Sequence, residues 1–355
     1  MSMRRPPLFV LALTLALSVG ALVHAADDFV LSRFSEYLDA LRIQAAIPGL
    51  ASAIVGPADV TWEGAFGHRD VDRNDVMRVD TPFQLDGTTQ AFVASLAMRC
   101  ASNGLLSLDD MVGTFSPTSP DAGVTIKQLL THTTTGPNGL TFSYRPERLA
   151  PLAAAVARCS DATFRGGVST RLDQLAMADS VPGSDVVTLQ PPAEGFTASA
   201  LQRYSGALLR LTMPYAVDAR GRATASSYTA PTLTPASGMI STVRDLEQFD
   251  LGLKKGVVLR PEWRTLAWTP PTGGNGQPLP HAYGWFVQTY NGGPIVWQFG
   301  VSDNASSSMI ISLPQRGVTL ILLANSAGLV RPFDLAAGDV TVSPFARLFL
   351  SVFAR

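Results

Sequence analysis

Few residues in this chain have the type and spacing needed for redox or metal chemistry. The sequence contains two cysteines, Cys100 and Cys159, and outside the N-terminal segment its histidines are His68, His132 and His281. Metal sites in proteins combine His, Cys or carboxylate ligands at short, characteristic spacings. These five residues are widely separated and are not flanked by such ligands. We therefore predict no bound metal and no cofactor.

Both cysteines lie in apolar runs that are typical of buried helices. A buried free thiol behaves as a small apolar group. We interpret Cys100 and Cys159 as two separate buried thiols. The alternative is a disulfide between them, which export to an oxidising compartment would permit.

A long apolar run at residues 91–106 follows several side chains that could do chemistry. The run is apolar on nearly every face, which predicts a helix buried at the centre of the fold. Asp86 precedes it and is a candidate N-cap. Thr88 and Thr89 carry hydroxyl groups, but no Lys or His lies nearby in the sequence to activate them as nucleophiles. We interpret both as residues of the first helical turn.

The N-terminus has the pattern of a secretory signal peptide. Arg4 and Arg5 are followed by an apolar run at residues 8–23 and by small residues ending at Ala25. We predict cleavage after Ala25, no membrane span in the mature chain of residues 26–355, and a periplasmic or secreted protein. The alternative is an uncleaved N-terminal anchor.

The charge composition argues against binding to nucleic acid. Charged residues make up 15% of the 355-residue chain, the formal net charge is -1, and there is no cluster of Lys and Arg. Nucleic-acid-binding surfaces are strongly basic, so we predict no nucleic-acid partner.

Periodicity and turn residues predict an α+β fold. The predicted helices cover residues 29–41, 91–106, 149–156, 201–211, 241–253 and 344–353, and the predicted strands cover residues 50–55, 60–66, 283–290, 295–301, 306–313 and 318–325. Short connections between the strands require antiparallel pairing. We expect one antiparallel sheet, built from residues 26–85 and 235–355 and covered by the first and last helices, with a mostly helical part at residues 86–234.

Five runs occur in an order that resembles the family of serine β-lactamases and penicillin-binding proteins, in particular class C β-lactamases and DD-peptidases. They are TPFQLDGTTQ at 81–90, NGLLSLDD at 103–110, TIKQLLTHT at 125–133, ASGMISTVRDL at 236–246 and LANS at 323–326. Each run is weak evidence alone, but together they extend over nearly the whole mature chain. The resemblance implies the fold of this family.

The resemblance also identifies the positions where the family carries its chemistry. That chemistry uses Ser-x-x-Lys, Tyr-x-Asn, and Lys-Thr-Gly or His-x-Gly motifs. In this sequence the matching positions hold Gly87 and Gln90, Tyr144 and Pro146, and Gln298 and Gly300. The nucleophile, its base and the cationic clamp for a substrate carboxylate are therefore absent. Deleting the nucleophile or base of another serine hydrolase costs roughly a millionfold in turnover.

We therefore expect an exported protein that is catalytically inactive and acts as a binding or scaffold protein of the cell envelope. Its partner would be a peptidoglycan-derived peptide, another small molecule or an envelope protein. The alternative is an active esterase, amidase or β-lactamase with a displaced nucleophile.

The resemblance also implies which side chains border the old catalytic cleft. The candidates are Asp86, Thr88, Thr89, Arg145 and Phe299. A fixed negative charge on Asp86 would oppose an oxyanion and an anionic ligand.

The remaining polar side chains near these motifs have structural interpretations. We interpret Arg145 as a solvated loop residue, with carboxylate binding as the alternative, and we expect Gln90 to form a hydrogen bond with Tyr144. His132 is interpreted as a core or capping residue, and His281 is the histidine that could reach the cleft from a loop.

Overall fold

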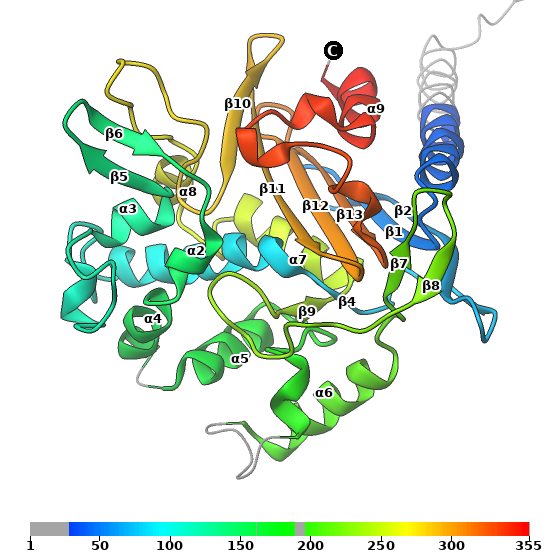
Figure 1. Ribbon diagram of the computed structural model, residues 1–355, viewed down its shortest axis with the longest axis horizontal. Coiled ribbons are helices and arrows are strands. Elements are labelled where there is room, and N and C mark those ends of the chain that lie inside the picture. Colours follow the sequence, from blue (N-terminus) through cyan, green and yellow to red (C-terminus); the bar gives the residue numbers. More distant parts are fainter. Residues whose placement is uncertain (1–27, 161, 189–195, 355) are drawn as a thin grey trace, which may run out of the picture.

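The computed structural model describes residues 28–160, 162–188 and 196–354 (Figure 1). The predicted signal peptide lies outside these residues. None of the helices within the described ranges has the length and apolar character needed to cross a membrane.

A seven-stranded antiparallel sheet forms the centre of the molecule, in the order β10-β11-β12-β13-β1-β2-β3. Its strands are β1 (Gly49–Val55), β2 (Val60–Asp70), β3 (Asp75–Val76), β10 (Phe286–Tyr290), β11 (Gly293–Ser302), β12 (Ser306–Leu313) and β13 (Val318–Ala324). The first and last strands in the chain to enter the sheet, β1 and β13, pair with each other. This arrangement confirms the predicted α+β fold with one antiparallel sheet.

The turn between β10 and β11 shows why the sequence fixes this hairpin. Asn291 and Gly292 connect the two strands, and both have positive φ, 48° and 78°. A two-residue loop with positive φ at both positions matches the twist of the strands that it joins, and Asn and Gly are the residues that adopt it most readily.

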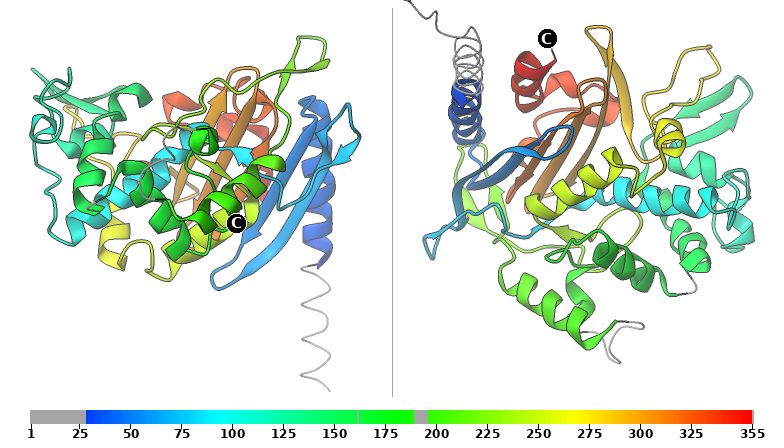
Figure 2. Two further views of the ribbon diagram at one scale, coloured as in Figure 1. Left: turned by 90° about the horizontal axis from the view of Figure 1, so that it is seen from below. Right: turned by 180° about the vertical axis from the view of Figure 1, so that it is seen from behind.

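Helices cover both faces of the sheet (Figures 1 and 2). On one face lie the helix at residues 28–44 and α9 (Pro344–Phe353), whose apolar side chains form one core cluster with the sheet. The prediction of cover by the first and last helices is confirmed for this face. The other face packs against α2 (Thr89–Ser102) and α7 (Val243–Lys254), which belong to a second core cluster.

Helix α2 is buried along most of its length, as its all-round apolar pattern predicts. Eleven of its 14 residues are buried, because the sheet lies on one side and further helices lie on the other. The helices that contact α2 there are α4 (Leu152–Ser160) and α8 (Pro261–Ala267). Further helices of this part are α3 (Ile126–Leu130), α5 (Phe164–Gln174) and α6 (Ala198–Leu209), and α6 packs in a separate core cluster. Within the described residues Cys100 and Cys159 are free thiols where α2 meets α4. This agrees with the interpretation of two separate thiols rather than a disulfide, although Cys159 is only partly buried.

The segment 86–234 contains short strands that periodicity did not predict. These are β5 (Thr133–Gly136) with β6 (Gly139–Phe142) and β7 (Tyr215–Val217) with β8 (Ala223–Ala225), while β4 (Phe83–Gln84) pairs with β9 (Ile240–Ser241). Short 3-10 helices complete the chain: η1 (Asp86–Thr88), η2 (Val112–Thr114), η3 (Pro146–Leu149), η4 (Ser184–Val187), η5 (Ala327–Leu329), η6 (Leu335–Ala337) and η7 (Val340–Val342).

The backbone of η1 lies directly against the backbone of β11, and glycines on both sides make this approach possible. A Cβ atom on Gly87 would lie 2.6 Å from the carbonyl oxygen of Phe299 and 3.3 Å from the Cα of Gly300. A Cβ atom on Gly300 would lie 2.6 Å from the nitrogen of Gly87. Real Cβ atoms are not found this close to backbone atoms, so a side chain at either position requires one backbone to move.

We predict that Gly87→Ala lowers the free energy of unfolding by about 1–3 kcal/mol, the usual cost of inserting a methyl group into a packed site. The matched control is Gly206→Ala, on the exposed face of α6, where a Cβ atom meets nothing within 4 Å. That change should raise the free energy of unfolding by roughly 0.5–1 kcal/mol. Urea unfolding of both variants checks the pair. A Gly87→Ala protein as stable as the parent would show that the two backbones separate freely.

Candidate functional site

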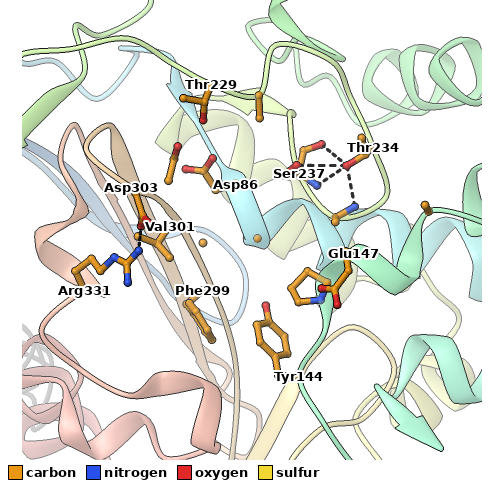
Figure 3. A pocket seen from close by; sticks show the side chains of 17 residues that line it. Asp86, Tyr144, Glu147, Thr229, Thr234, Ser237, Phe299, Val301, Asp303 and Arg331 are labelled. Atoms are coloured by element: carbon orange, nitrogen blue, oxygen red, sulfur yellow. Dashed lines mark hydrogen bonds and ion pairs between the residues drawn. The ribbon is translucent and has the colours of Figure 1, made fainter.

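An open cleft of about 980 Å³ lies where η1, the end of β11, the segment after β6 and the loop before β9 meet (Figure 3). Its lining residues are Asp86, Gly87, Tyr144, Pro146, Glu147, Ala150, Thr229, Ala230, Thr234, Ala236, Ser237, Phe299, Gly300, Val301, Ser302, Asp303 and Arg331. The volume is at the upper end of the range usual for small-molecule sites.

Each of the three motif positions contributes at least one residue to the lining of this cleft, but some of the motif residues lie outside the lining. Gly87, Tyr144, Pro146 and Gly300 line it, together with the candidates Asp86 and Phe299. Four others among the sequence-derived residues lie outside the lining: Gln90, Gln298, Thr88 and Thr89. The fifth, Arg145, forms an exposed ion pair with Glu147, with its Nε 3.0 Å from Oε1.

Asp86 is the most unusual residue of the cleft. Its φ is +49°, a left-handed conformation that is rare for a residue with a side chain, and it is only 2% exposed. The expectation that it caps the buried helix is wrong, because no side-chain capping bond forms at the start of η1 or α2. Its Oδ1 accepts a hydrogen bond from Gln84 Nε2 (2.9 Å) and its Oδ2 accepts one from Ser306 Oγ (2.6 Å).

Burial controls the protonation of Asp86. Desolvation raises the pKa of its carboxyl group to about 7, and the hydrogen bonds from Ser306 and Gln84 offset only part of that shift. No cation forms an ion pair with this carboxylate among the described residues. A strained backbone and a buried carboxyl group without a counter-ion both cost stability, and such features concentrate at functional sites.

Gln90, at the position of the family's catalytic base, belongs to a closed chain of hydrogen bonds. Its Nε2 donates to the hydroxyl oxygen of Tyr144 (2.8 Å), as expected from the sequence. The Nδ1 of His132 accepts from the backbone N–H of Arg145 (3.2 Å), so the proton lies on Nε2, which donates to Gln90 Oε1 (2.9 Å). The amide is therefore satisfied at both ends.

Neither ring in this chain of hydrogen bonds is suited to accept a proton from a nucleophile. Burial lowers the pKa of His132 to about 4, and burial raises the pKa of Tyr144 above its ordinary value. His132 has a polar role that sequence spacing did not reveal, because 42 residues separate it from Gln90.

The two threonines that follow Gly87 face away from the cleft. Thr88 Oγ1 lies 2.7 Å from Ser308 Oγ on β12, and the Ser308 hydroxyl in turn donates to the carbonyl of Leu85 (2.6 Å). Thr89 is fully buried, and its Oγ1 accepts from the backbone N–H of Met239 (3.4 Å). The helical direction that puts residue 87 at the cleft turns these hydroxyl groups into the protein interior.

Gln298 also points into the interior. Its Nε2 donates to the carbonyl of Gly284 (3.0 Å) and its Oε1 accepts from the backbone N–H of Phe299 (2.9 Å). His281 is fully buried, and its ring centroid lies 4.7 Å from that of His132. His281 is not part of the cleft lining, so the expectation that it could reach the cleft from a loop is wrong.

The lining has hydroxyl groups but no Lys or His beside them among the described residues. Thr229, Thr234, Ser237 and Ser302 reach the cleft, and the part of the chain that the structure describes contributes no Lys or His to its lining. The hydroxyl groups of Thr234 and Ser237 hydrogen-bond to each other, 3.3 Å apart. An activated nucleophile needs a base within hydrogen-bond reach.

The pKa of Asp86 predicts how its replacement affects stability. The carboxyl pKa rises from 3.8 to about 7 on folding, so the folded protein retains a proton that the unfolded chain loses between these pH values. The free energy of unfolding therefore falls as the pH rises through this window. Asp86→Asn removes that loss and should stabilise the protein at pH 8 by up to about 4 kcal/mol, with little difference near pH 4.

Urea unfolding of parent and variant at several pH values tests this expectation. Asp303→Asn serves as the control, because it breaks an exposed ion pair with Arg331 that is worth less than about 1 kcal/mol. An Asp86→Asn effect that is equal at both ends of the pH range would contradict the burial of an ionisable carboxyl group.

Comparisons with known proteins agree with this geometry. The family model described as Beta-lactamase matches residues 33–166 and 184–341 of the chain. A β-lactamase of Psychrobacter immobilis is 30% identical over 138 residues, which span 39% of this chain and only 34% of that relative.

Two solved structures show the shared fold. The D-alanine carboxypeptidase of Burkholderia cenocepacia superposes with a TM-score of 0.68 at 18% identity, covering 91% of this chain and 99% of that one. The D-amino acid amidase of Ochrobactrum anthropi in complex with D-phenylalanine also gives 0.68, at 16% identity, covering 92% and 99%. At these identities the likeness establishes the fold alone, whereas the family model covers most of the sequence. The chain therefore belongs to the β-lactamase family.

Proposed function

We propose that this chain is an exported, non-acylating member of the β-lactamase family that binds a ligand in its cleft. The observation that carries the proposal is at Gly87. This residue has no side chain, and the carbonyl oxygen of Phe299 lies 2.6 Å from the point where a Cβ atom would be. The position that holds the family's nucleophile therefore has no side chain, and backbone atoms of β11 leave no room for one.

The expected loss of turnover supports this proposal. Removing the nucleophile or base of another serine hydrolase lowers turnover by roughly a millionfold, and the residual acceleration over water from binding and the oxyanion site is about 10³–10⁴. In this chain both groups are replaced, by Gly87 and Gln90, and Gln90 is already bound to Tyr144 and His132.

Thr88 and Thr89, the candidates for a displaced nucleophile, do not favour the alternative of an active hydrolase. Thr88 and Thr89 hydrogen-bond within the interior and lie outside the lining of the cleft. The relatives named as carboxypeptidase and amidase share the fold, and fold by itself does not transfer activity.

The open cleft favours a binding role over a purely structural one. A scaffold has no need of a concave space of about 980 Å³ with polar groups on opposite walls. A small molecule or a short peptide, such as a peptidoglycan fragment, fits this shape better than a flat protein surface. Export rests on the signal-like N-terminal sequence.

The direct test is to incubate the purified protein with a labelled penicillin and measure its intact mass. We expect no covalent adduct, while an acylating class C β-lactamase run in parallel acquires one. A stoichiometric adduct on the unmodified protein would overturn the proposal.

A second arm of this experiment uses the double variant Gly87→Ser with Gln90→Lys. We expect it to remain unacylated, because the Phe299 carbonyl occupies the space that the serine Cβ needs. Acylation of the double variant would show that the backbone of β11 retreats easily, and that the missing side chains alone explain the inactivity.

A further inference from the structure

We propose that the ligand of this cleft carries a protonated amine, which binds against the carboxylate of Asp86 with an apolar or aromatic group beside Tyr144 and Phe299. This inference rests on the proposed function of the cleft as a binding site, and it names the chemical class of the ligand.

The first support is the balance of charge around the cleft. Its described lining contains three carboxyl groups, on Asp86, Glu147 and Asp303, and a single cation, Arg331. Arg331 forms an ion pair with Asp303, and Glu147 pairs with Arg145, which lies outside the lining. Asp86 is the lining carboxylate without a cationic partner. A carboxylate ligand would therefore meet negative charge and find no unpaired cation in the lining. An ammonium ligand would find the unpaired carboxylate of Asp86.

The second support is the bonding capacity left on Asp86. Both of its oxygens accept one hydrogen bond from a neutral donor, Gln84 or Ser306. Each oxygen of an ionised carboxylate can accept more than one hydrogen bond. An ammonium group brings the missing charge together with additional N–H donors. Because Asp86 is almost fully buried, water screens this attraction less than it screens a surface ion pair.

The third support is a pair of aromatic rings in the cleft lining. The rings of Tyr144 and Phe299 both line the cleft, with centroids 5.4 Å apart (Figure 3). Aromatic rings attract cations through their faces and also offer apolar contact to the body of a ligand. The hydroxyl of Tyr144 is already hydrogen-bonded to Gln90, so its ring is held in position.

The test compares three phenyl-bearing probes of similar size and different charge: phenethylamine, 2-phenylethanol and 3-phenylpropionate, titrated into the purified protein by calorimetry at about pH 8. We expect phenethylamine to bind most tightly and 3-phenylpropionate most weakly. Asp86→Asn should weaken phenethylamine binding at least tenfold and leave the affinity for the alcohol nearly unchanged.

The control variant is Asp245→Asn. Asp245 is also a buried carboxyl group with a pKa raised by burial, to about 6, but it lies on α7 outside the cleft and accepts hydrogen bonds from Ser180 and Asp179. Phenethylamine affinity should be retained in this variant. Loss of binding in both variants would mean a general effect on the fold, and would count against a specific role for Asp86.

The pH dependence of binding provides a second readout. The other titratable or charged groups near Asp86 are Tyr228, whose hydroxyl donates to the carbonyl of Thr212, and the paired residues Asp303 and Arg331 across the cleft. With the Asp86 pKa near 7, about a tenth of the carboxyl groups are ionised at pH 6 and about nine tenths at pH 8. Phenethylamine affinity should therefore rise about tenfold between these pH values and stay flat in Asp86→Asn.

The outcomes separate this inference from the proposed function. Tighter binding of 3-phenylpropionate than of phenethylamine, amine binding that is insensitive to Asp86→Asn, or no binding of any probe would overturn the amine assignment. None of these results would produce a covalent penicillin adduct. Such an adduct would overturn the non-acylating function whatever the probes show.

Discussion

The close approach of two backbones determines the character of this site. Where η1 meets β11, Gly87 and Gly300 leave no room for a side chain between the strand and the start of the buried helix. The Ser308 hydroxyl donates to the carbonyl of Leu85 in the same layer and links η1 to β12 as well. With the backbone fixed in this way, a side chain at residue 87 would meet backbone atoms of β11, and Asp86 is held in the lining of the cleft.

Asp86 carries a cost that the rest of the fold must offset. It combines a positive φ with a buried carboxyl group whose pKa lies near 7, and no residue in the described part of the chain pairs with it as a counter-ion. An apolar or amide side chain would avoid the electrostatic part of that cost. The cleft contains residues from all three motif regions. A carboxylate at this position has a physical reason if its charge binds the ammonium group of a ligand.

The amide side chains of Gln90 and Gln298 link neighbouring elements of the fold. Gln90 connects Tyr144 with His132, and Gln298 connects β11 with the backbone at Gly284. An amide suits these places because it donates at one end and accepts at the other, so it satisfies two neighbours without a charge. The same property prevents either residue from acting as a base or as a cationic clamp.

The sequence by itself determined the sheet, the covering helices and which residues occupy the positions that match the family's motifs. These follow from local patterns: short strand-like runs separated by turns in β10 to β13, an all-round apolar α2, the Asn291–Gly292 turn, and the identities of residues 87 and 90. Only the tertiary structure decided where Asp86, Thr88 and His132 point. Asp86 does not cap its helix, Thr88 turns to β12, and His132 meets Gln90, because each direction depends on an element that is distant in the chain. Local periodicity carries no information about such partners.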